Sequence, residues 1–237
     1  MLVQFTLVQS TLVQSTLVQS TLVQSTLAQS IPFTLPTVEA FQLQGKILGS
    51  IFLLLWGLEL LDSLFLRGYL NRFGIYPRQA RGLQGIFLYP LLHGDLKHLA
   101  ANTMPLMILG WFILLSGVPA FALVTGVVWL VSGLGVWLLG SPRSNHIGAS
   151  GIVFGYLGFL VARGYFDRSF GAIAIAVIVG LAYGSLIWGV LPFQRGKSWE
   201  GHLFGLIGGG LAARYWPEIL DWFQFYVQQF GDQVPGS

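Results

Sequence analysis

The sequence predicts an all-α membrane protein, a bundle of hydrophobic helices, and three observations lead to this fold class. Of its 237 residues, 54% are apolar and only 9% are charged, and the mean hydropathy is +0.70. Soluble proteins carry about a quarter charged residues, so a chain this poor in charge could not cover a soluble surface. The apolar residues also come in long runs rather than at helical spacing beside a polar face, which indicates membrane-spanning segments.

Six apolar stretches are each about long enough to cross a hydrocarbon core of roughly 30 Å. They lie near residues 47–66, 96–115, 118–140, 148–165, 171–191 and 199–216. The long connection between the first two, residues 67–95, mixes arginines with aromatic and aliphatic residues. This composition favours a segment that lies in the membrane interface. We therefore expect a six-helix domain over residues 45–216 with a long interfacial first loop.

The two ends of the chain differ from this domain. Residues 6–30 repeat the pentapeptide TLVQS five times, the last copy reading TLAQS. A period of five matches neither a helix nor a strand, so no continuous apolar face forms. We expect residues 1–40 to be a low-complexity, poorly ordered tail without a catalytic role. Residues 217–230 are too short and too polar to span, which predicts an interfacial helix and tail over residues 217–237.

Composition also excludes several kinds of chemistry and partner. The chain has no cysteine, which excludes disulfides, thiolate metal sites and a cysteine nucleophile. The net charge of +3 is small, and the basic residues are scattered over loops. No basic patch of the kind that nucleic acid needs is present. The lipid bilayer is therefore the expected environment, and nucleic acid is not an expected partner.

Polar side chains near the ends of the predicted spans are the functional candidates, because polar groups are costly inside a bilayer. They are His93, His98, Asn102, His146, Ser150 and His202, and they include every histidine of the chain. Alternating spans run in the same direction, so the second, fourth and sixth spans all begin on one face of the membrane. We expect these side chains to converge there.

Ser150 lies in the first turn of the fourth span, where unpaired backbone N–H groups and the helix dipole stabilise a developing anion. A serine nucleophile also needs a base, and His202 lies in the first turn of the sixth span. His98 and Asn102 are four residues apart and share one face of the second span. An imidazole and an amide near a serine–histidine pair are plausible further donors to an oxyanion.

Glycines recur every four residues on two of these spans and form smooth faces that allow close helix packing. They are Gly151 and Gly155 on the fourth span and Gly201, Gly205 and Gly209 on the sixth. Such packing can bring Ser150 to His202, but it also means that Ser150 alone could be packing material. Asn102 alone could likewise be interhelical glue. Three histidines could in principle hold a metal, but no carboxylate or thiolate joins them at a ligand-like spacing, so neither a metal nor a cofactor is expected.

Three motifs hold most of these candidates: GASG at residues 148–151, HGDLKHLAAN at 93–102 and GHLFGLIGG at 201–209. They resemble, in this order, the Gly-x-Ser-Gly motif, the His-x4-His-x3-Asn motif and the histidine helix of the bacterial type of the rhomboid family of intramembrane serine proteases. The similarity covers about residues 45–216, and the motifs stand in the right order on the right spans.

The resemblance implies a Ser–His dyad without an acidic third member. Ser150 would be the nucleophile, His202 the general base, and Asn102, His98 and the Ser150 N–H the oxyanion hole. An aromatic residue packs on the catalytic imidazole in this family, and the outer histidine of the motif is structural. The supporting residues would be His93, Gly148, Gly151, Phe154, Gly155, Gly205 and Gly209.

The resemblance further implies cleavage of single-span transmembrane proteins in the cell membrane, with cytoplasmic termini and a site that opens outward. A count of basic residues opposes this orientation, with eight in the loops opposite the termini and four on the side of the termini. We favour the resemblance, because the arginines of 67–95 belong to a structured interfacial loop. A non-catalytic rhomboid-like protein that binds membrane clients is the alternative function, although this chain keeps both serine and histidine. A small transporter or channel would explain the polar residues but not the three motifs, and His146 has no assigned role.

Overall fold

The computed structural model describes residues 37–192, 198–218 and 221. The chain divides into Met1–Thr34 and Leu35–Ser237, and every described residue belongs to the second part. The prediction of a poorly ordered tail therefore lies outside the described residues, apart from residues 37–40. The predicted interfacial helix also lies outside them, apart from residues 217, 218 and 221.

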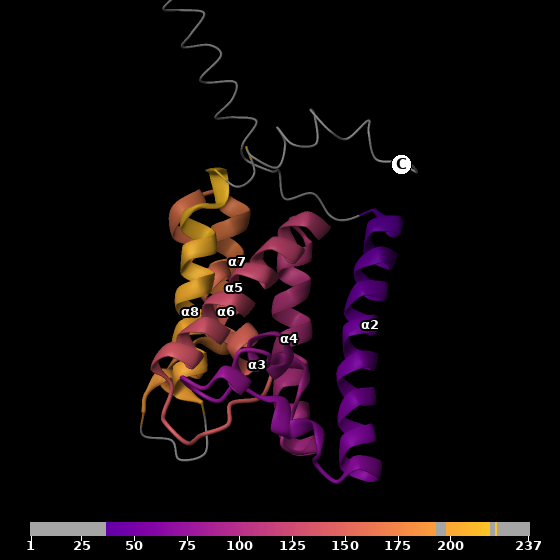
Figure 1. Ribbon diagram of the computed structural model, residues 1–237. Helices are drawn as coiled ribbons and strands as arrows, with labels where there is room; N and C mark the ends of the chain where they lie inside the picture. The colour runs from indigo at the N-terminus through magenta and orange to yellow at the C-terminus, as the bar shows by residue number, and fades with distance from the viewer. Residues whose placement is uncertain (1–36, 193–197, 219–220, 222–237) are drawn as a thin grey trace, which may run out of the picture. The chain divides into compact units, whose positions relative to one another are not determined.

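Six longer helices make up most of the described part (Figure 1). They are α2 (Val38–Leu61), α4 (Leu96–Leu114), α5 (Val118–Leu139), α6 (Ser150–Asp167), α7 (Phe170–Tyr183) and α8 (Trp199–Arg214). Each overlaps one of the six predicted apolar stretches. The described residues contain no strand, only an isolated antiparallel bridge between Ile75 and His146. The described part of the chain is therefore all-α, as the sequence predicts.

The first helix begins earlier than the apolar stretch near residues 47–66 suggested. Thr37 caps α2 by accepting a hydrogen bond from the Ala40 N–H at 3.2 Å. The added turns are polar, so hydropathy alone does not reveal them. Gln44 is buried there, donates to the Leu114 carbonyl at 3.3 Å and accepts from the Trp111 indole at 3.0 Å. Its amide thus joins the start of α2 to the end of α4 and satisfies its own polar atoms.

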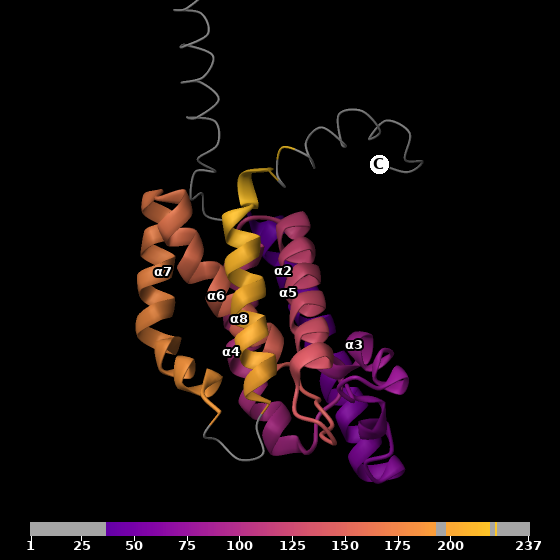
Figure 2. The ribbon, with the colours of Figure 1, turned by 60° about the vertical axis from the view of Figure 1, so that its left-hand side comes forward.

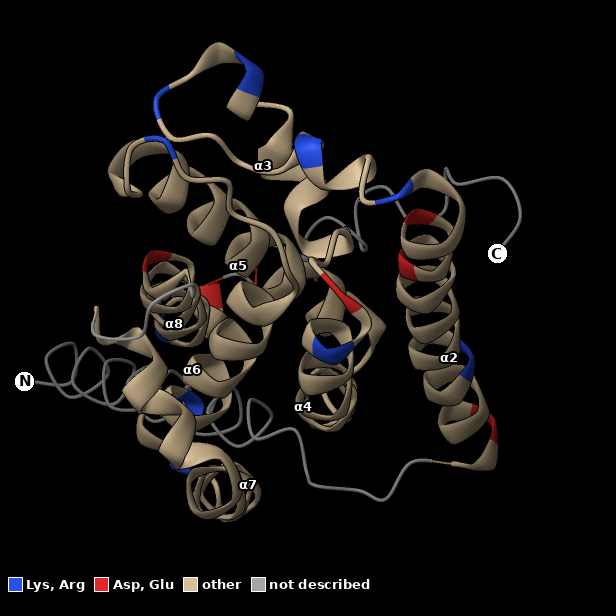
Figure 3. Cartoon of the chain, turned by 90° about the horizontal axis from the view of Figure 1, so that it is seen from below, with Lys and Arg blue, Asp and Glu red and all other residues tan. Residues whose placement is uncertain are grey.

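The connection after α2 is a chain of short helical segments packed against α5. The π-helical turn η1 (Asp62–Leu66) follows α2, and then come η2 (Leu70–Phe73), η3 (Ala80–Gly82), α3 (Gly85–Leu88) and η4 (Tyr89–Leu91). Two indoles of α5 hold the connection: Trp129 donates to the Ile86 carbonyl at 2.8 Å and Trp137 to the Gln79 carbonyl at 3.0 Å. Seen from below, lysines and arginines lie mostly in this connection and at helix ends (Figure 3).

The helix that begins at Ser150 lies at the centre of the bundle (Figure 2). α6 packs on α4, α5, α7 and α8, and its residues from Gly151 to Leu160 are all buried. α7 continues into η5 (Gly184–Val190) and buries only Val179, so it lies at the edge of the bundle. Ser150 therefore stands at the start of the most enclosed helix of the bundle.

Among the described residues, three helical segments are long and apolar enough to cross a membrane: Val38–Leu66, Val118–Leu139 and Phe170–Val190. The sequence had predicted six such spans. The helices outside this group are α4, α6 and α8, and these are the helices that carry His98, Asn102, Ser150 and His202. Neighbouring helices shield much of their surface, so they can carry polar groups and glycines that a lipid-facing helix could not.

Candidate active site

Ser150 and His202 come into hydrogen-bond contact although they are 52 residues apart in sequence. Ser150 begins α6, His202 lies in the first turn of α8, and His202 Nε2 is 3.0 Å from Ser150 Oγ. The other ring nitrogen, Nδ1, is 2.8 Å from the carbonyl oxygen of Gly189 in η5. A carbonyl can only accept, so we assign the ring proton to Nδ1. Nε2 then presents its lone pair to the serine hydroxyl, which is the arrangement of a nucleophile and its base.

Phe154 stacks on the imidazole of His202. The ring centroids are 4.1 Å apart, and the ring planes differ by only 3°. Phe154 is one turn after Ser150 on α6, so a single helix carries both the hydroxyl and the aromatic surface on which the imidazole rests. Together with the Gly189 carbonyl, the stack holds the ring of His202 in one orientation.

The start of α6 is held by a buried histidine. The backbone N–H of Ala149 donates to Nε2 of His93 at 3.2 Å, and no side chain caps the helix. His93 is fully buried, and burial, followed by the proximity of His98, lowers its pKa to about 4. It is therefore a neutral acceptor at pH 7. His93 thus fixes the backbone immediately before Ser150 without taking part in the serine–histidine contact.

His98 and Asn102 lie beside the backbone that leads to Ser150. Gly148 has a φ of +116°, and a Cβ there would lie 2.7 Å from His98 Cε1 and 3.7 Å from Asn102 Nδ2. Glycine is therefore required twice, for its backbone conformation and for this close approach. Asn102 is 8% exposed, and its Nδ2 has no hydrogen-bond partner among the described residues. A buried amide donor without a partner, close to a serine, is a candidate to bind a developing oxyanion.

The two glycine-bearing helices pack against each other as expected from their sequence. A Cβ on Gly205 would overlap the carbonyl oxygen of Gly151, and one on Gly209 would lie 2.6 Å from the Phe159 amide nitrogen. Gly155 differs in part, because a Cβ there would overlap Val128 of α5. Its carbonyl oxygen faces Gly209 of α8. The backbones of α6 and α8 therefore approach so closely that side chains at Gly205 and Gly209 would drive the two helices apart.

His146 lies outside the serine–histidine contact. It is buried, and its ring is 2.6 Å from the hydroxyls of both Ser144 and Ser198. Sequence reasoning missed Ser198 and the Gly189 carbonyl. The capping role of Ser198 could have been predicted, because serine is a preferred residue at helix N-caps. Its hydroxyl accepts a hydrogen bond from the Gly201 N–H, three residues later. Gly189 contributes a backbone atom, which leaves no signature in the residue type.

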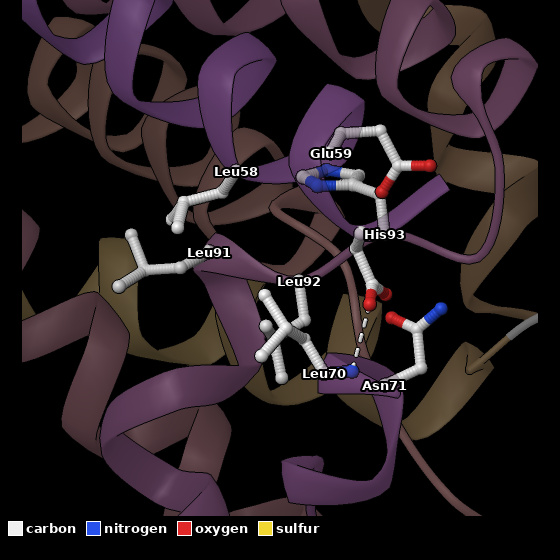
Figure 4. Close-up of a pocket in the computed structure, with 8 residues that line it drawn as sticks. Leu58, Glu59, Leu70, Asn71, Leu91, Leu92 and His93 are labelled. Carbon is white, nitrogen blue, oxygen red and sulfur yellow. Dashed lines mark hydrogen bonds between the residues drawn. The ribbon is translucent and has the colours of Figure 1, made fainter. Parts of the chain in front are cut away.

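A small pocket is lined by His93 together with residues of α2, η1, η2 and η4 (Figure 4). The two acidic residues that line it accept hydrogen bonds from nearby residues: Asp62 from the Leu70 N–H at 2.8 Å, and Glu59 from the Ser63 hydroxyl at 2.7 Å. In the part of the chain that the structure describes, no three His, Asp or Glu side chains are placed to hold a metal ion. Neither Ser150 nor His202 lines this pocket, so it is distinct from the serine–histidine contact.

The fold and site define a class: a helical membrane protein in which a half-buried serine and a buried histidine meet at the starts of two packed helices. A family model of the Rhomboid domain matches residues 80–217. An uncharacterized protein of Mycobacterium tuberculosis is 41% identical over 168 residues, 68% of this chain and 70% of the relative. An uncharacterized protein of Mycobacterium leprae is 42% identical over 168 residues, 68% and 66% of the two chains. A protein of Acanthamoeba polyphaga mimivirus named as a rhomboid protein is 28% identical over 134 residues, 53% of this chain and 70% of its own.

The chain belongs to the rhomboid family, as the three sequence motifs indicated. Its family and the three long apolar helical segments among its described residues both support an integral membrane protein.

Proposed function

We propose that the chain is an intramembrane serine endopeptidase that cleaves single-span transmembrane proteins by a Ser–His dyad. The observation that carries this proposal is the 3.0 Å contact between Ser150 Oγ and His202 Nε2, with Nδ1 of the same ring engaged by the Gly189 carbonyl. The domain would cover residues 45–216 with six membrane-spanning helices. Its site would open to the extracytoplasmic side of the cell membrane.

The chemistry follows from the position of each group. Ser150 Oγ attacks the substrate carbonyl carbon while its proton passes to His202 Nε2. The oxyanion would be held by the Ser150 N–H, Asn102 Nδ2 and His98. When the tetrahedral intermediate collapses, the peptide C–N bond breaks and His202 gives its proton to the leaving amine. Water, deprotonated by His202, then hydrolyses the acyl–serine ester and restores the free hydroxyl.

Labelling with a serine-reactive fluorophosphonate in detergent tests the assignment. Wild type should be labelled, and both Ser150→Ala and His202→Ala should lose labelling, because the first lacks the nucleophile and the second lacks its base. A single-span substrate in liposomes should be cleaved by wild type and left intact by Ser150→Ala. Equal labelling of the three proteins would contradict the dyad. Absence of both labelling and cleavage in folded wild type would favour the alternative, a non-catalytic rhomboid-like protein that binds membrane clients.

A Gly189→Ala variant should lose about tenfold in kcat, because a displaced general base loses much of its contribution. A Cβ at Gly189 would lie 2.7 Å from Phe154 Cζ and 3.2 Å from His202 Nδ1, so it would push both rings. Gly184→Ala is the matched control in the same short helical segment, η5, since a Cβ there meets nothing within 4 Å. Comparison of kcat for the two variants on one substrate is the measurement. Equal kcat values would show that the Gly189 contact does not orient His202.

A further inference from the structure

His146 takes no part in the serine–histidine dyad, yet it is buried and both of its ring nitrogens form hydrogen bonds. Its backbone forms the isolated bridge with Ile75, with Ile75 N–H···O and His146 N–H···O distances both of 3.0 Å. Its Nε2 is 2.6 Å from Ser144 Oγ, and its Nδ1 is 2.6 Å from Ser198 Oγ. One residue therefore joins three segments: the connection before α4, the loop before α6, and the start of α8.

The protons in this network can be placed from its two ends. The Ser144 hydroxyl donates to the Ser141 carbonyl, so its oxygen is left to accept from His146 Nε2–H. Nδ1 of the neutral ring is then an acceptor, and the Ser198 hydroxyl donates to it. Ser198 Oγ in turn accepts from the Gly201 N–H at 3.3 Å and thereby caps α8. The direction is consistent throughout, from the α8 backbone through Ser198 to His146 and on to Ser144.

The link between His146 and Ser198 runs beside the link between Ser150 and His202. His146 is four residues before Ser150, and Ser198 is four residues before His202. The Ser150–His202 pair thus joins α6 to α8 at the reacting atoms, and the His146–Ser198 pair joins the loop before α6 to the cap of α8, four residues earlier on each side. Two further hydrogen bonds join the loop before α6 to the start of α8. Glu200 of α8 accepts from the backbone N–H of Ser141 at 3.0 Å and from the Ser141 hydroxyl at 2.8 Å.

We propose that His146 is a positioning residue of the active site, which sets the distance between Ser150 and His202 through its Nδ1 bond to the cap of α8. This inference rests on the proposed function. The Nδ1 bond affects the dyad because it joins the loop that leads to Ser150 to the cap of the helix that carries His202. Nε2 bonds Ser144 only two residues away, within the same loop. The two ring nitrogens therefore have different tasks, and variants can separate them.

Asparagine and glutamine distinguish the two nitrogens of His146. The amide of asparagine branches at the same carbon as Nδ1, so His146→Asn can still accept from Ser198. The longer glutamine places its amide near the position of Nε2, so His146→Gln can still donate to Ser144. His146→Ala removes both bonds. We expect His146→Ala to lose on the order of tenfold or more in kcat with little change in KM, because the dyad is displaced while the substrate-binding surface remains. His146→Asn should recover most of this loss, and His146→Gln should not.

The matched control is Ser144→Ala, which removes the partner of Nε2 and leaves the bond to Ser198. It should keep kcat near that of wild type, and kcat should be expressed per folded protein from a thermal-unfolding measurement. Recovery by His146→Gln instead of His146→Asn would overturn the proposal, as would equal losses in His146→Ala and Ser144→Ala. If His146→Ala does not fold, the ranking of the asparagine, glutamine and Ser144 variants still decides. Wild-type kcat in His146→Gln would likewise overturn it.

The acid side of the pH profile gives a readout that a purely structural role would not change. Burial lowers the pKa of His146, while the carboxylate of Glu200, the charged group of α8 that acts on it, raises it in part. The ring is therefore neutral at pH 7 and gains a proton on Nδ1 only as the pH falls below its ordinary value of about 6.5. That proton would turn the Ser198 hydroxyl away. Because asparagine does not titrate, the ratio of kcat for His146→Asn to that for wild type should rise as the pH falls, and any pH dependence that the two proteins share cancels in this ratio. A constant ratio would contradict this role of Nδ1.

The same set of proteins separates this inference from the proposed function. If Ser150→Ala keeps fluorophosphonate labelling and cleavage, the proposed function itself fails. If Ser150→Ala is inactive while His146→Ala keeps the wild-type kcat, only the positioning role fails.

Discussion

A Gly205→Val variant is expected to lose about a hundredfold or more in both cleavage and fluorophosphonate labelling, although Ser150 and His202 are unchanged. A Cβ at this position overlaps the carbonyl oxygen of Gly151, a backbone atom that cannot rotate away. The two helices would have to separate, and a displacement of about 1 Å can cost about a hundredfold in rate. The measurement is the second-order labelling rate, followed by kcat on a single-span substrate.

Gly210→Val provides the control for the loss of a glycine in α8. A Cβ at Gly210 meets nothing within 4 Å, so this variant adds the same side chain to the same helix without forcing it from α6. It should keep its labelling rate, and its thermal unfolding should change little. If Gly210→Val loses as much activity as Gly205→Val, the effect belongs to the helix as a whole rather than to its contact with α6.

Sequence parity and glycine spacing predicted which helices would meet. Ser150 and His202 each stand in the first turn of an even-numbered span, and parity alone brings such starts to one face. The glycines of α6 and α8 supply the second half of the argument, because small residues at a spacing of four permit close backbone contact. These two patterns depend on residue type and position, which is why they can be read without a structure.

Contributions from the backbone and from polar ends could not be predicted. The acceptor for His202 Nδ1 is the Gly189 carbonyl, and every residue has a carbonyl, so no side-chain pattern marks it. The first turns of α2 were not predicted, because the prediction followed apolar runs. Gln44 is buried in these turns, and two specific hydrogen bonds satisfy its amide. The partners of His146 are serines, which are common in loops.

The distribution of polarity among the helices has a simple physical reason. Phe170–Val190 is among the most apolar segments and is little buried, as a surface facing lipid requires. α6 begins with a serine and holds several glycines, and it is enclosed by its neighbours from Gly151 to Leu160. Polar groups are tolerated in a membrane where protein rather than hydrocarbon surrounds them. A span criterion based on hydropathy therefore finds the outer helices more readily than those that carry the site.

Replacement of Asn102 by leucine is expected to lower kcat by about a hundredfold to a thousandfold while the protein keeps its thermal stability or gains some. Removal of one oxyanion donor typically costs this much in rate. The stability argument is separate: Asn102 Nδ2 is buried without a partner among the described residues, and a buried unpaired polar group costs about 1–3 kcal/mol. Leucine has a similar shape and carries no such cost. The two measurements are kcat and the temperature of thermal unfolding in the same detergent.

Thr103→Val is the matched control for Asn102→Leu, and it should show the opposite pattern. Its hydroxyl accepts from the Trp56 indole at 3.1 Å and donates to the Leu99 carbonyl at 2.8 Å, so valine leaves the half-buried indole without this partner. Stability should fall while kcat stays near that of wild type, since Thr103 is not among the site residues. A fall in kcat without a fall in stability for Asn102→Leu, and the reverse for Thr103→Val, would support the proposed role of Asn102 as an oxyanion donor. If Asn102→Leu instead unfolds at a clearly lower temperature and keeps its kcat, the amide is a packing element of α4 and the oxyanion role is wrong.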